Sequence, residues 1–224
     1  MHSFHPAQEG ASLVEEERWD AHTLFGCPSE VWTCCFAAST STGQSALSND
    51  GTNVVISGGD DCTMKLWDVR SGLFQPLAKV GNAEFEAGVT AVSYHSTMDH
   101  IFAVGSYDEV VRFYDVRSLK NPLGRVNVGG GVWRIRWHPN IGGRILIGAM
   151  HGGCRIVNAD DFTDPRIESQ FTKHESMAYG ADWLFGDMKG GDDGESSSHA
   201  ASCSFYDRRV CLWRDYTCKS LTIL

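Results

Sequence analysis

The feature that most constrains the fold of this chain is an internal repeat. Three segments share an apolar run, a short polar turn and a second run rich in aromatic and apolar residues: VVISGGDDCTMKLWDVR (54–70), FAVGSYDEVVRFYDVR (102–117) and SCSFYDRRVCLWRD (202–215). A fourth copy, LIGAMHGGCRIVNAD (146–160), carries His151 where the other copies carry Asp. A period of about 40–45 residues predicts an array of similar structural units.

Each unit has the pattern of short antiparallel strands. Apolar and polar residues alternate on either side of the polar turn, which is typical of a β-hairpin. A further candidate strand precedes each hairpin, namely VWTCCFAA, GVTAVSYH, GVWRIRWHP or YGADWLF. Three to four strands per unit, closing on Trp-Asp or a variant of it, predict the blade of a WD-repeat β-propeller. We therefore expect an all-β fold with about four blades, bounded by residues 19–80, 81–128, 129–173 and 174–224.

Four blades are at the lower limit of the rings of about four to eight blades that propellers form. We expect an incomplete ring, and a complete four-bladed ring remains the alternative. Residues 1–18 are expected to form an N-terminal segment outside these blades, with SLVEEERW as a candidate outer strand of a missing blade. The tract 186–202 is rich in Gly, Asp and Ser and predicts a disordered surface loop.

Composition excludes some classes of function. The net charge of −9 disfavours a nucleic-acid partner, because nucleic-acid binding depends on Lys and Arg that neutralise phosphates. No secretory signal is visible and no apolar stretch approaches the ~18 residues of a membrane span, so we expect a soluble cytoplasmic protein with no membrane partner. The 8 cysteines lack the paired spacing of a zinc site, so reduced thiols, no metal and no cofactor are expected.

The chain resembles WD-repeat proteins, in which a His, a Ser, an Asp and a Trp form a buried hydrogen-bonded network within a blade. Such groups need partners, because burial of an unpaired polar or charged group costs free energy. The first blade carries the whole set, and the fourth keeps three members with Cys203 in the Ser position. The expected structural residues are His22, Ser57, Asp61 and Trp67 in the first blade and His174, Asp207 and Trp213 in the fourth.

The second and third blades depart from this network. The second blade has Asp108, but Val104 and Tyr114 take the Ser and Trp positions and no His precedes its first strand. The third blade has His151 in the place of the Asp. Their polar turn residues are therefore expected to lack the usual partners, and His151 is either a solvated turn residue or a site residue.

One face of the predicted propeller gathers polar and aromatic residues, because the turn after each second strand opens on the same face as the loop before each first strand. Acids beside aromatic rings suit a cationic ligand, above all a quaternary ammonium group, through cation–π attraction. His95 and His138 follow first strands, on the opposite face, and are expected to form turns. The residues expected to converge are His151, Asp108, Tyr107, Gly129, Gly130, Gly131, Trp133, Arg134, Tyr179, Asp182 and Trp183.

Several strings resemble, in order, the C-terminal half of one WD-repeat family: KLWDVR, GSYDE, GVWRIRWHP, MHGG and YGADW. Over about residues 19–215 the chain is similar to the diphthine methyl ester hydrolase family of diphthamide biosynthesis. The resemblance implies removal of a methyl ester from a modified histidine of translation elongation factor two, with this factor and other diphthamide enzymes as partners. A non-catalytic scaffold that presents a protein substrate to other enzymes remains the alternative.

Ester hydrolysis needs a base that activates water and donors that stabilise the oxyanion. A histidine near its ordinary pKa of ~6.5 can act as the base at neutral pH, so His151 is the first catalytic candidate and Asp108 the second. Backbone N–H groups of Gly129 to Gly131, or the guanidinium of Arg134, are candidate oxyanion donors. Cys203 and Ser204 have no evident base beside them in sequence, so direct attack by water is expected.

Overall fold

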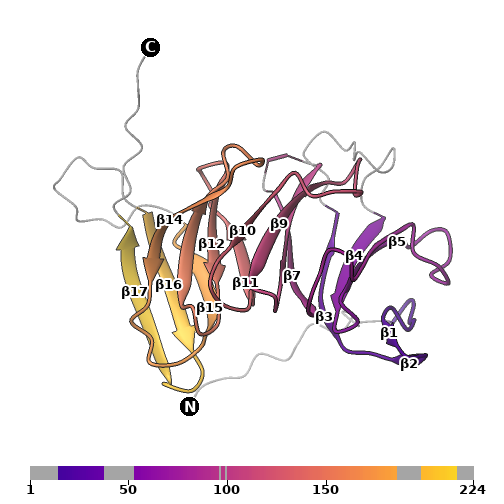
Figure 1. Cartoon of the computed structure of the whole chain (residues 1–224), viewed down its shortest axis with the longest axis horizontal. Helices are drawn as coiled ribbons and strands as arrows, with labels where there is room; N and C mark the ends of the chain where they lie inside the picture. Colours follow the sequence, from indigo (N-terminus) through magenta and orange to yellow (C-terminus); the bar gives the residue numbers. More distant parts are fainter. Residues whose placement is uncertain (1–14, 38–52, 96, 99, 186–197, 216–224) are drawn as a thin grey trace, which may run out of the picture.

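The computed structural model describes residues 15–37, 53–95, 97–98, 100–185 and 198–215, which form four antiparallel sheets in chain order (Figure 1). A short hairpin, β1 (Thr23–Leu24) and β2 (Cys27–Pro28), precedes them. The first sheet contains β3 (Val31–Phe36), β4 (Val54–Gly59), β5 (Thr63–Asp68) and β6 (Ala78–Val80). The second contains β7 (Val89–Tyr94), β8 (Ile101–Ser106), β9 (Val110–Asp115) and β10 (Gly124–Asn127).

The third and fourth sheets repeat this order. The third contains β11 (Arg134–Trp137), β12 (Arg144–Gly148), β13 (Cys154–Asn158) and β14 (Arg166–Phe171), and the fourth contains β15 (Ala178–Trp183), β16 (Ser198–Ser204) and β17 (Arg209–Asp215). The sheets match the four predicted blades. The loop predicted over 186–202 is too long at its C-terminal end, because β16 begins at Ser198. Residues 186–197 and 1–14 lie outside the described residues.

Apolar cores fill the spaces between neighbouring sheets. Along β8, Phe102 packs into the core shared with the first sheet, whereas Ala103 packs into the core shared with the third. Along β12, Ile147 faces the second sheet and Leu146 faces the fourth. The middle strands are therefore buried on both faces, which explains their nearly continuous apolar runs. Each large apolar side chain among them, such as Phe102, Leu146 or Ile147, contributes about 1.5–3 kcal/mol.

The arc of blades is open. In Figure 1 the sheets succeed one another from β3–β6 at one end to β15–β17 at the other. Large apolar side chains are exposed on the two end sheets, including Phe36 on β3 and Val210 and Leu212 on β17. The expected incomplete ring agrees with this arrangement.

The first blade contains the complete hydrogen-bonded network. His22 Nδ1 donates to Asp61 Oδ1 at 2.7 Å, and the Ser57 hydroxyl donates to His22 Nε2 at 2.8 Å. The Trp67 indole N–H donates to Ser57 Oγ at 2.8 Å. Burial lowers the pKa of His22 in spite of the neighbouring carboxylate, so the imidazole is neutral in this network. These contacts tie the loop before β3 to the middle of the sheet.

The fourth blade contains the same network with one change of register. His174 Nε2 and Ser202 Oγ lie 2.9 Å apart, and the Trp213 indole N–H donates to the same hydroxyl at 3.1 Å. His174 Nδ1 lies 3.3 Å from Asp207 Oδ2. The assignment of Cys203 to the Ser position was therefore wrong. The polar turn of this blade is one residue longer than that of the first, which moves the network hydroxyl to Ser202.

His95 and His138 form turns on the opposite side of the sheets from the loops that precede the first strands. His95 Nδ1 accepts hydrogen bonds from the backbone N–H groups of Thr97 and Met98, both at 3.1 Å. His138 Nδ1 accepts from the N–H groups of Asn140 at 3.1 Å and Ile141 at 3.0 Å. Each ring nitrogen must be unprotonated to accept these bonds.

Acid sensitivity follows from this arrangement. Burial, with the positive charge of Arg144, lowers the pKa of His138 to about 4. The unfolded chain binds a proton near pH 6.5, so this histidine favours the folded state above pH 6.5 and opposes it increasingly as the pH falls toward 4. We expect the free energy of unfolding to fall over this window, and to fall less in His138→Asn, whose side-chain oxygen can accept the same bonds. Denaturant titrations at several pH values would measure it, and equal slopes for both proteins would contradict it.

The polar turns after β4, β8 and β12 have two backbone conformations. Cys62 and Glu109 follow the aspartates of their turns and adopt the left-handed conformation, with φ of 55° and 70°. In the third blade the residues with positive φ are Met150 and Gly153, on either side of His151 and Gly152. The carbonyl of Met150 accepts a hydrogen bond from Ala178 N at 2.9 Å, which ties this turn to the start of β15.

Candidate functional site

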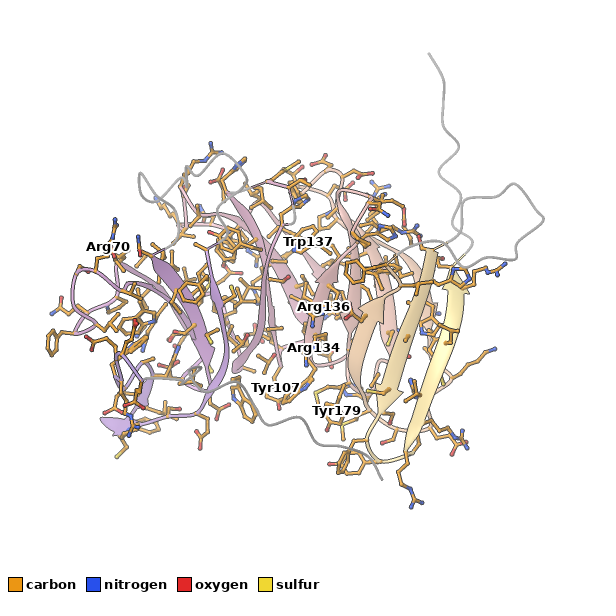
Figure 2. The ribbon with its side chains drawn as sticks, turned by 180° about the vertical axis from the view of Figure 1, so that it is seen from behind. Arg70, Tyr107, Arg134, Arg136, Trp137 and Tyr179 are labelled. Carbon is orange, nitrogen blue, oxygen red and sulfur yellow. The ribbon has the colours of Figure 1, made fainter. Side chains whose placement is uncertain are left out.

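Four aromatic side chains lie together at one end of the sheets, and we call them the aromatic face: Trp32, Tyr107, Trp133 and Tyr179. The Trp133 ring is central, with centroid distances of 5.5 Å to Trp32, 5.8 Å to Tyr107 and 5.4 Å to Tyr179. The Trp32 and Tyr107 rings are 6.0 Å apart. These rings come from all four blades, and Figure 2 shows Tyr107, Tyr179 and Arg134 near the same end of the molecule. The predicted convergence of Tyr107, Trp133 and Tyr179 is therefore present.

The aromatic face has an acidic neighbour that sequence reasoning missed. The Trp32 indole N–H donates to Asp60 Oδ1 at 3.2 Å, and Asp60 is exposed. Burial and the charge of Asp60 raise the pKa of Tyr107, so its phenol is neutral at pH 7. The position of Trp32 had a sequence signal, because Val-Trp precedes or opens the first strand both at Trp32 and at Trp133.

A pocket of about 280 Å³ lies beside the aromatic face, along the first strands of three blades. Trp32 and Trp133 line it together with Thr33, Val92, Arg134 and Arg136. Residues alternate along β11, so Arg134 and Arg136 are exposed on the pocket side while Ile135 and Trp137 are buried in the core. Figure 2 shows Arg134, Arg136 and Trp137 in succession along this strand.

Two residues expected at the site belong to the other end of β15. Trp183 is 4% exposed, its indole N–H donates to the Arg136 carbonyl at 3.0 Å, and its ring lies 4.7 Å from that of His138. Asp182 Oδ1 lies 3.7 Å from Arg136 Nε. Because β15 spans Ala178–Trp183, its last residues are several ångströms from Tyr179 along the strand. Trp183 is a core residue and Asp182 pairs with Arg136.

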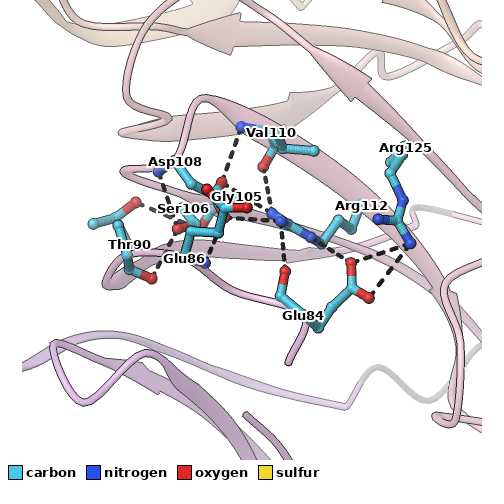
Figure 3. A network of polar contacts seen from close by, with 10 residues as sticks. Glu84, Glu86, Thr90, Gly105, Ser106, Asp108, Val110, Arg112 and Arg125 are labelled. Carbon is cyan, nitrogen blue, oxygen red and sulfur yellow. Dashed lines mark hydrogen bonds and ion pairs between the residues drawn. The ribbon is translucent and has the colours of Figure 1, made fainter. Parts of the chain in front are cut away.

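Asp108 is not the free carboxylate that the sequence suggested. Its side chain is 5% exposed and accepts two hydrogen bonds from Arg112, at 3.0 and 2.8 Å (Figure 3). It also accepts the backbone N–H groups of Glu86 and Val110. Arg112 therefore replaces the missing histidine of this blade, and Asp108 is positioned as a structural residue.

His151 is an exposed member of the predicted set. Its side chain is 63% exposed, and Nε2 lies 3.5 Å from Glu109 Oε1 on the turn of the second blade. Glu109 follows Tyr107 by two residues, so His151 lies at the same end of the sheets as the aromatic face. Water and a substrate can reach this imidazole, and its role as a base stays a prediction.

The glycines before β11 allow close packing against the turn of His151. A Cβ on Gly130 would lie 2.1 Å from the Ala149 carbonyl oxygen. One on Gly131 would lie 2.8 Å from Met150 Sδ and 3.0 Å from the ring of Tyr107. Gly129 is exposed and has a φ of 73°, which favours glycine. Packing therefore accounts for Gly130 and Gly131, and their predicted role as oxyanion donors stays a prediction.

The described residues contain no group of three His, Cys, Asp or Glu side chains that could hold a metal ion. Within the same residues, no helix is long and apolar enough to cross a membrane. The cysteines of the described segments are free thiols, including Cys35, Cys154, Cys203 and Cys211.

Comparison with known proteins agrees with the fold. The WD domain, G-beta repeat family matches residues 19–68 and 76–115. A chain of the "Crystal Structure of Mitotic Checkpoint Complex" has a TM-score of 0.62 at 20% identity, covering 87% of this chain and 53% of that one. A computationally designed protein, Ika8, has a TM-score of 0.56 at 19% identity, covering 85% and 48%. With its His-Ser-Trp networks and antiparallel blades, the chain is a WD-repeat β-propeller protein.

Curated relatives give the family within this class. A diphthine methyltransferase homolog of Dictyostelium discoideum is 34% identical over 94% of this chain and 55% of its own length. The Schizosaccharomyces pombe diphthine methyltransferase is 30% identical over 91% and 55%, and the Mus musculus protein of that name is 38% identical over 62% and 30%. Over most of its length the chain is similar to the diphthine methyltransferases, and it spans about half the length of the first of these relatives.

Proposed function

We propose that the protein hydrolyses the methyl ester of methylated diphthine on translation elongation factor two, with this chain supplying the surface that binds the quaternary ammonium group. The observation that carries the proposal is the aromatic face, in which Trp133 lies 5.4–5.8 Å from three other rings. Cations bind over aromatic rings, and Trp is the strongest partner. Asp60, hydrogen-bonded to Trp32, adds negative charge beside these rings. The relatives' names contain diphthine, which supports the same ligand chemistry.

The proposed reaction uses water as the nucleophile. His151 accepts a proton from water as the oxygen bonds to the ester carbonyl carbon, and the guanidinium of Arg134 donates to the oxyanion. The N–H of Gly129 donates to Asn127 Oδ1 at 2.8 Å and has no part in this step. The C–O bond to the methoxy group then breaks, and the methoxy oxygen takes a proton from His151 and leaves as methanol. The products are methanol and a carboxylic acid, which releases its proton to solvent and becomes a carboxylate, and the reaction needs no cofactor. Elongation factor two acts in translation, so we place the reaction in the cytoplasm.

A non-catalytic scaffold is the second candidate. The exposure of His151 and its 3.5 Å contact with Glu109 favour it, because catalytic bases usually need a more sheltered position. In that case the aromatic face would hold elongation factor two for other diphthamide enzymes. Purified full-length protein should be mixed with methylated elongation factor two and methanol measured over time. Release above the uncatalysed rate supports the hydrolase, whereas tight binding without release supports the scaffold.

Loss of the central ring tests the aromatic face separately from catalysis. We expect Trp133→Ala to weaken binding of tetramethylammonium by about 2- to 30-fold, which corresponds to the ~0.5–2 kcal/mol of a cation–π contact. Phe74→Ala is the matched control, because Phe74 is 98% exposed on the loop between β5 and β6. Titration calorimetry would measure both variants. Unchanged affinity in folded Trp133→Ala would contradict the assignment of the binding surface.

A further inference from the structure

In two blades, the acidic residue of the turn after the second strand pairs with a cationic side chain four residues later. In the first blade, Lys65 Nζ donates to Asp61 Oδ2 at 3.1 Å. In the second blade, Arg112 pairs with Asp108 at 2.8 Å. The third blade has a cation at the same position, Arg155 on β13, but the turn residue four before it is His151. Of these three blades, the third has the cation but a histidine in place of the carboxylate.

The second blade shows how fully such a guanidinium is normally compensated. Arg112 donates to both oxygens of Asp108 and, through Nε, to Glu84 Oε1 at 2.8 Å (Figure 3). Glu84 belongs to the loop that precedes β7. Burial lowers the pKa of Arg112, but the hydrogen bonds that it donates to Asp108 and Glu84, together with their negative charges, outweigh that effect and raise it.

Arg155 has neither carboxylate. The loop before β11, which corresponds to the loop of Glu84, contains Gly129 to Gly131 instead of an acidic residue. In the described part of the chain, Arg155 donates only through Nη1, to the carbonyl oxygens of Gly152 and, at 3.2 Å, Cys154. Burial lowers the pKa of this guanidinium, because the opposite charges that compensate Arg112 are missing here.

The second terminal nitrogen of Arg155 points toward the exposed end of this loop. Arg155 Nη2 lies 3.7 Å from the position that a Cβ on Gly129 would occupy, and Gly129 is exposed. Apart from Gly129 itself and its two chain neighbours, no other heavy atom of the described residues comes within 4 Å of that position. A ligand can therefore approach the guanidinium through the space beside Gly129. In any other residue type the side chain would fill this space.

We propose that Arg155 binds a carboxylate supplied from outside this chain, at the place that Glu84 and Asp108 occupy around Arg112. A guanidinium presents paired N–H groups that match a carboxylate, and such charge-assisted bonds are about twice as strong as neutral ones. The carboxylate belongs either to an Asp or Glu side chain of a protein partner or to a small ligand. This site is independent of the proposed ester hydrolysis, in which Arg155 has no part.

The test follows the Arg155 Nε–Hε resonance by ¹H–¹⁵N NMR during titration with sodium acetate at pH 7.5 and constant ionic strength, with sodium chloride as the salt control. Acetate is expected to shift this resonance saturably, and chloride is not. Arg155→Gln should remove the saturable response of neighbouring amides, including that of Gly129. Arg166→Gln, which changes an exposed arginine paired with Asp164 on β14, should retain it. A folded protein whose Arg155 resonance ignores acetate would overturn the proposal.

His151→Asp offers a second variant that keeps Arg155. A carboxylate at position 151 competes with acetate or repels it, so the affinity for acetate should fall about 5-fold, a factor that corresponds to ~1 kcal/mol. Unchanged affinity would contradict a site next to this turn. Titration with a peptide that carries one Glu and blocked termini distinguishes the two sources of the carboxylate, a protein side chain and a small ligand. Tighter binding than acetate identifies a protein partner, and equal binding identifies a small carboxylate.

Discussion

His151→Ala is expected to slow methanol release from methylated elongation factor two by about 10²–10⁴, the usual contribution of a general base. The fold should be retained, because the His151 side chain is 63% exposed and lies 3.5 Å from its ion-pair partner Glu109. Substrate binding should also be retained, because the aromatic face is unchanged. The rate of methanol release would be measured in samples quenched at successive times, with a full-length family member that carries the same residue.

Two further variants define the role of the imidazole. His151→Asp should be as slow as His151→Ala, because a carboxylate is a weaker base at pH 7. His199→Ala is the matched control, since His199 lies on β16 and accepts a hydrogen bond from Arg214. Its activity should equal that of the wild type. Full turnover by folded His151→Ala would reduce His151 to a turn residue and leave the scaffold as the better function.

Asp61→Ala should lower the free energy of unfolding by about 3–5 kcal/mol, because it leaves the buried cation of Lys65 without its carboxylate. Asp108→Ala should also lower it, because the buried guanidinium of Arg112 then keeps only the carboxylate of Glu84. Asp61 accepts hydrogen bonds from His22, Thr63 and Lys65. Burial alone would raise the pKa of Asp61, but these bonds outweigh it and lower the pKa. Asp108 is held by Arg112 and two backbone N–H groups.

Denaturant unfolding of the two variants would measure these losses, with Asp182→Ala as the control. The Asp182 side chain is 56% exposed and lies 3.7 Å from Arg136, so its loss should change stability by less than about 1 kcal/mol. The sequence pattern placed Asp61 in a buried network but left Asp108 without the usual partners, from which a small loss for Asp108→Ala would be expected. A wild-type unfolding curve for Asp108→Ala would restore that expectation and contradict the structural role of the Arg112 pair.

The repeat was sufficient to predict the blades, because alternation and turn chemistry are local. The resemblance to WD-repeat proteins added His22, Ser57, Asp61 and Trp67, whose spacing matches the network of that class. The partner of Asp108 was missed because an arginine four residues later replaces a histidine from another loop, and spacing rules for His do not reveal that exchange. Ser202 was missed because a turn longer by one residue shifts the register.

Long-range geometry limited the prediction of the site. Tyr107, Trp133 and Tyr179 were found because they lie in loops or at strand starts that share one face. Asp182 and Trp183 were misplaced because a strand of six residues carries its last side chains far from its first. Trp32 was overlooked because it lies on β3 between residues that read only as a core strand.

The hydrogen bond from Ala178 N to the Met150 carbonyl, at 2.9 Å, makes the local opening of the turn that carries His151 measurable. A backbone N–H in such a bond exchanges its hydrogen with solvent only when the bond opens. Ala178 directly precedes Tyr179, and Met150 directly precedes His151. The deuterium uptake of this single amide therefore reports how often the turn separates from β15, and with it how often His151 and the aromatic face move apart.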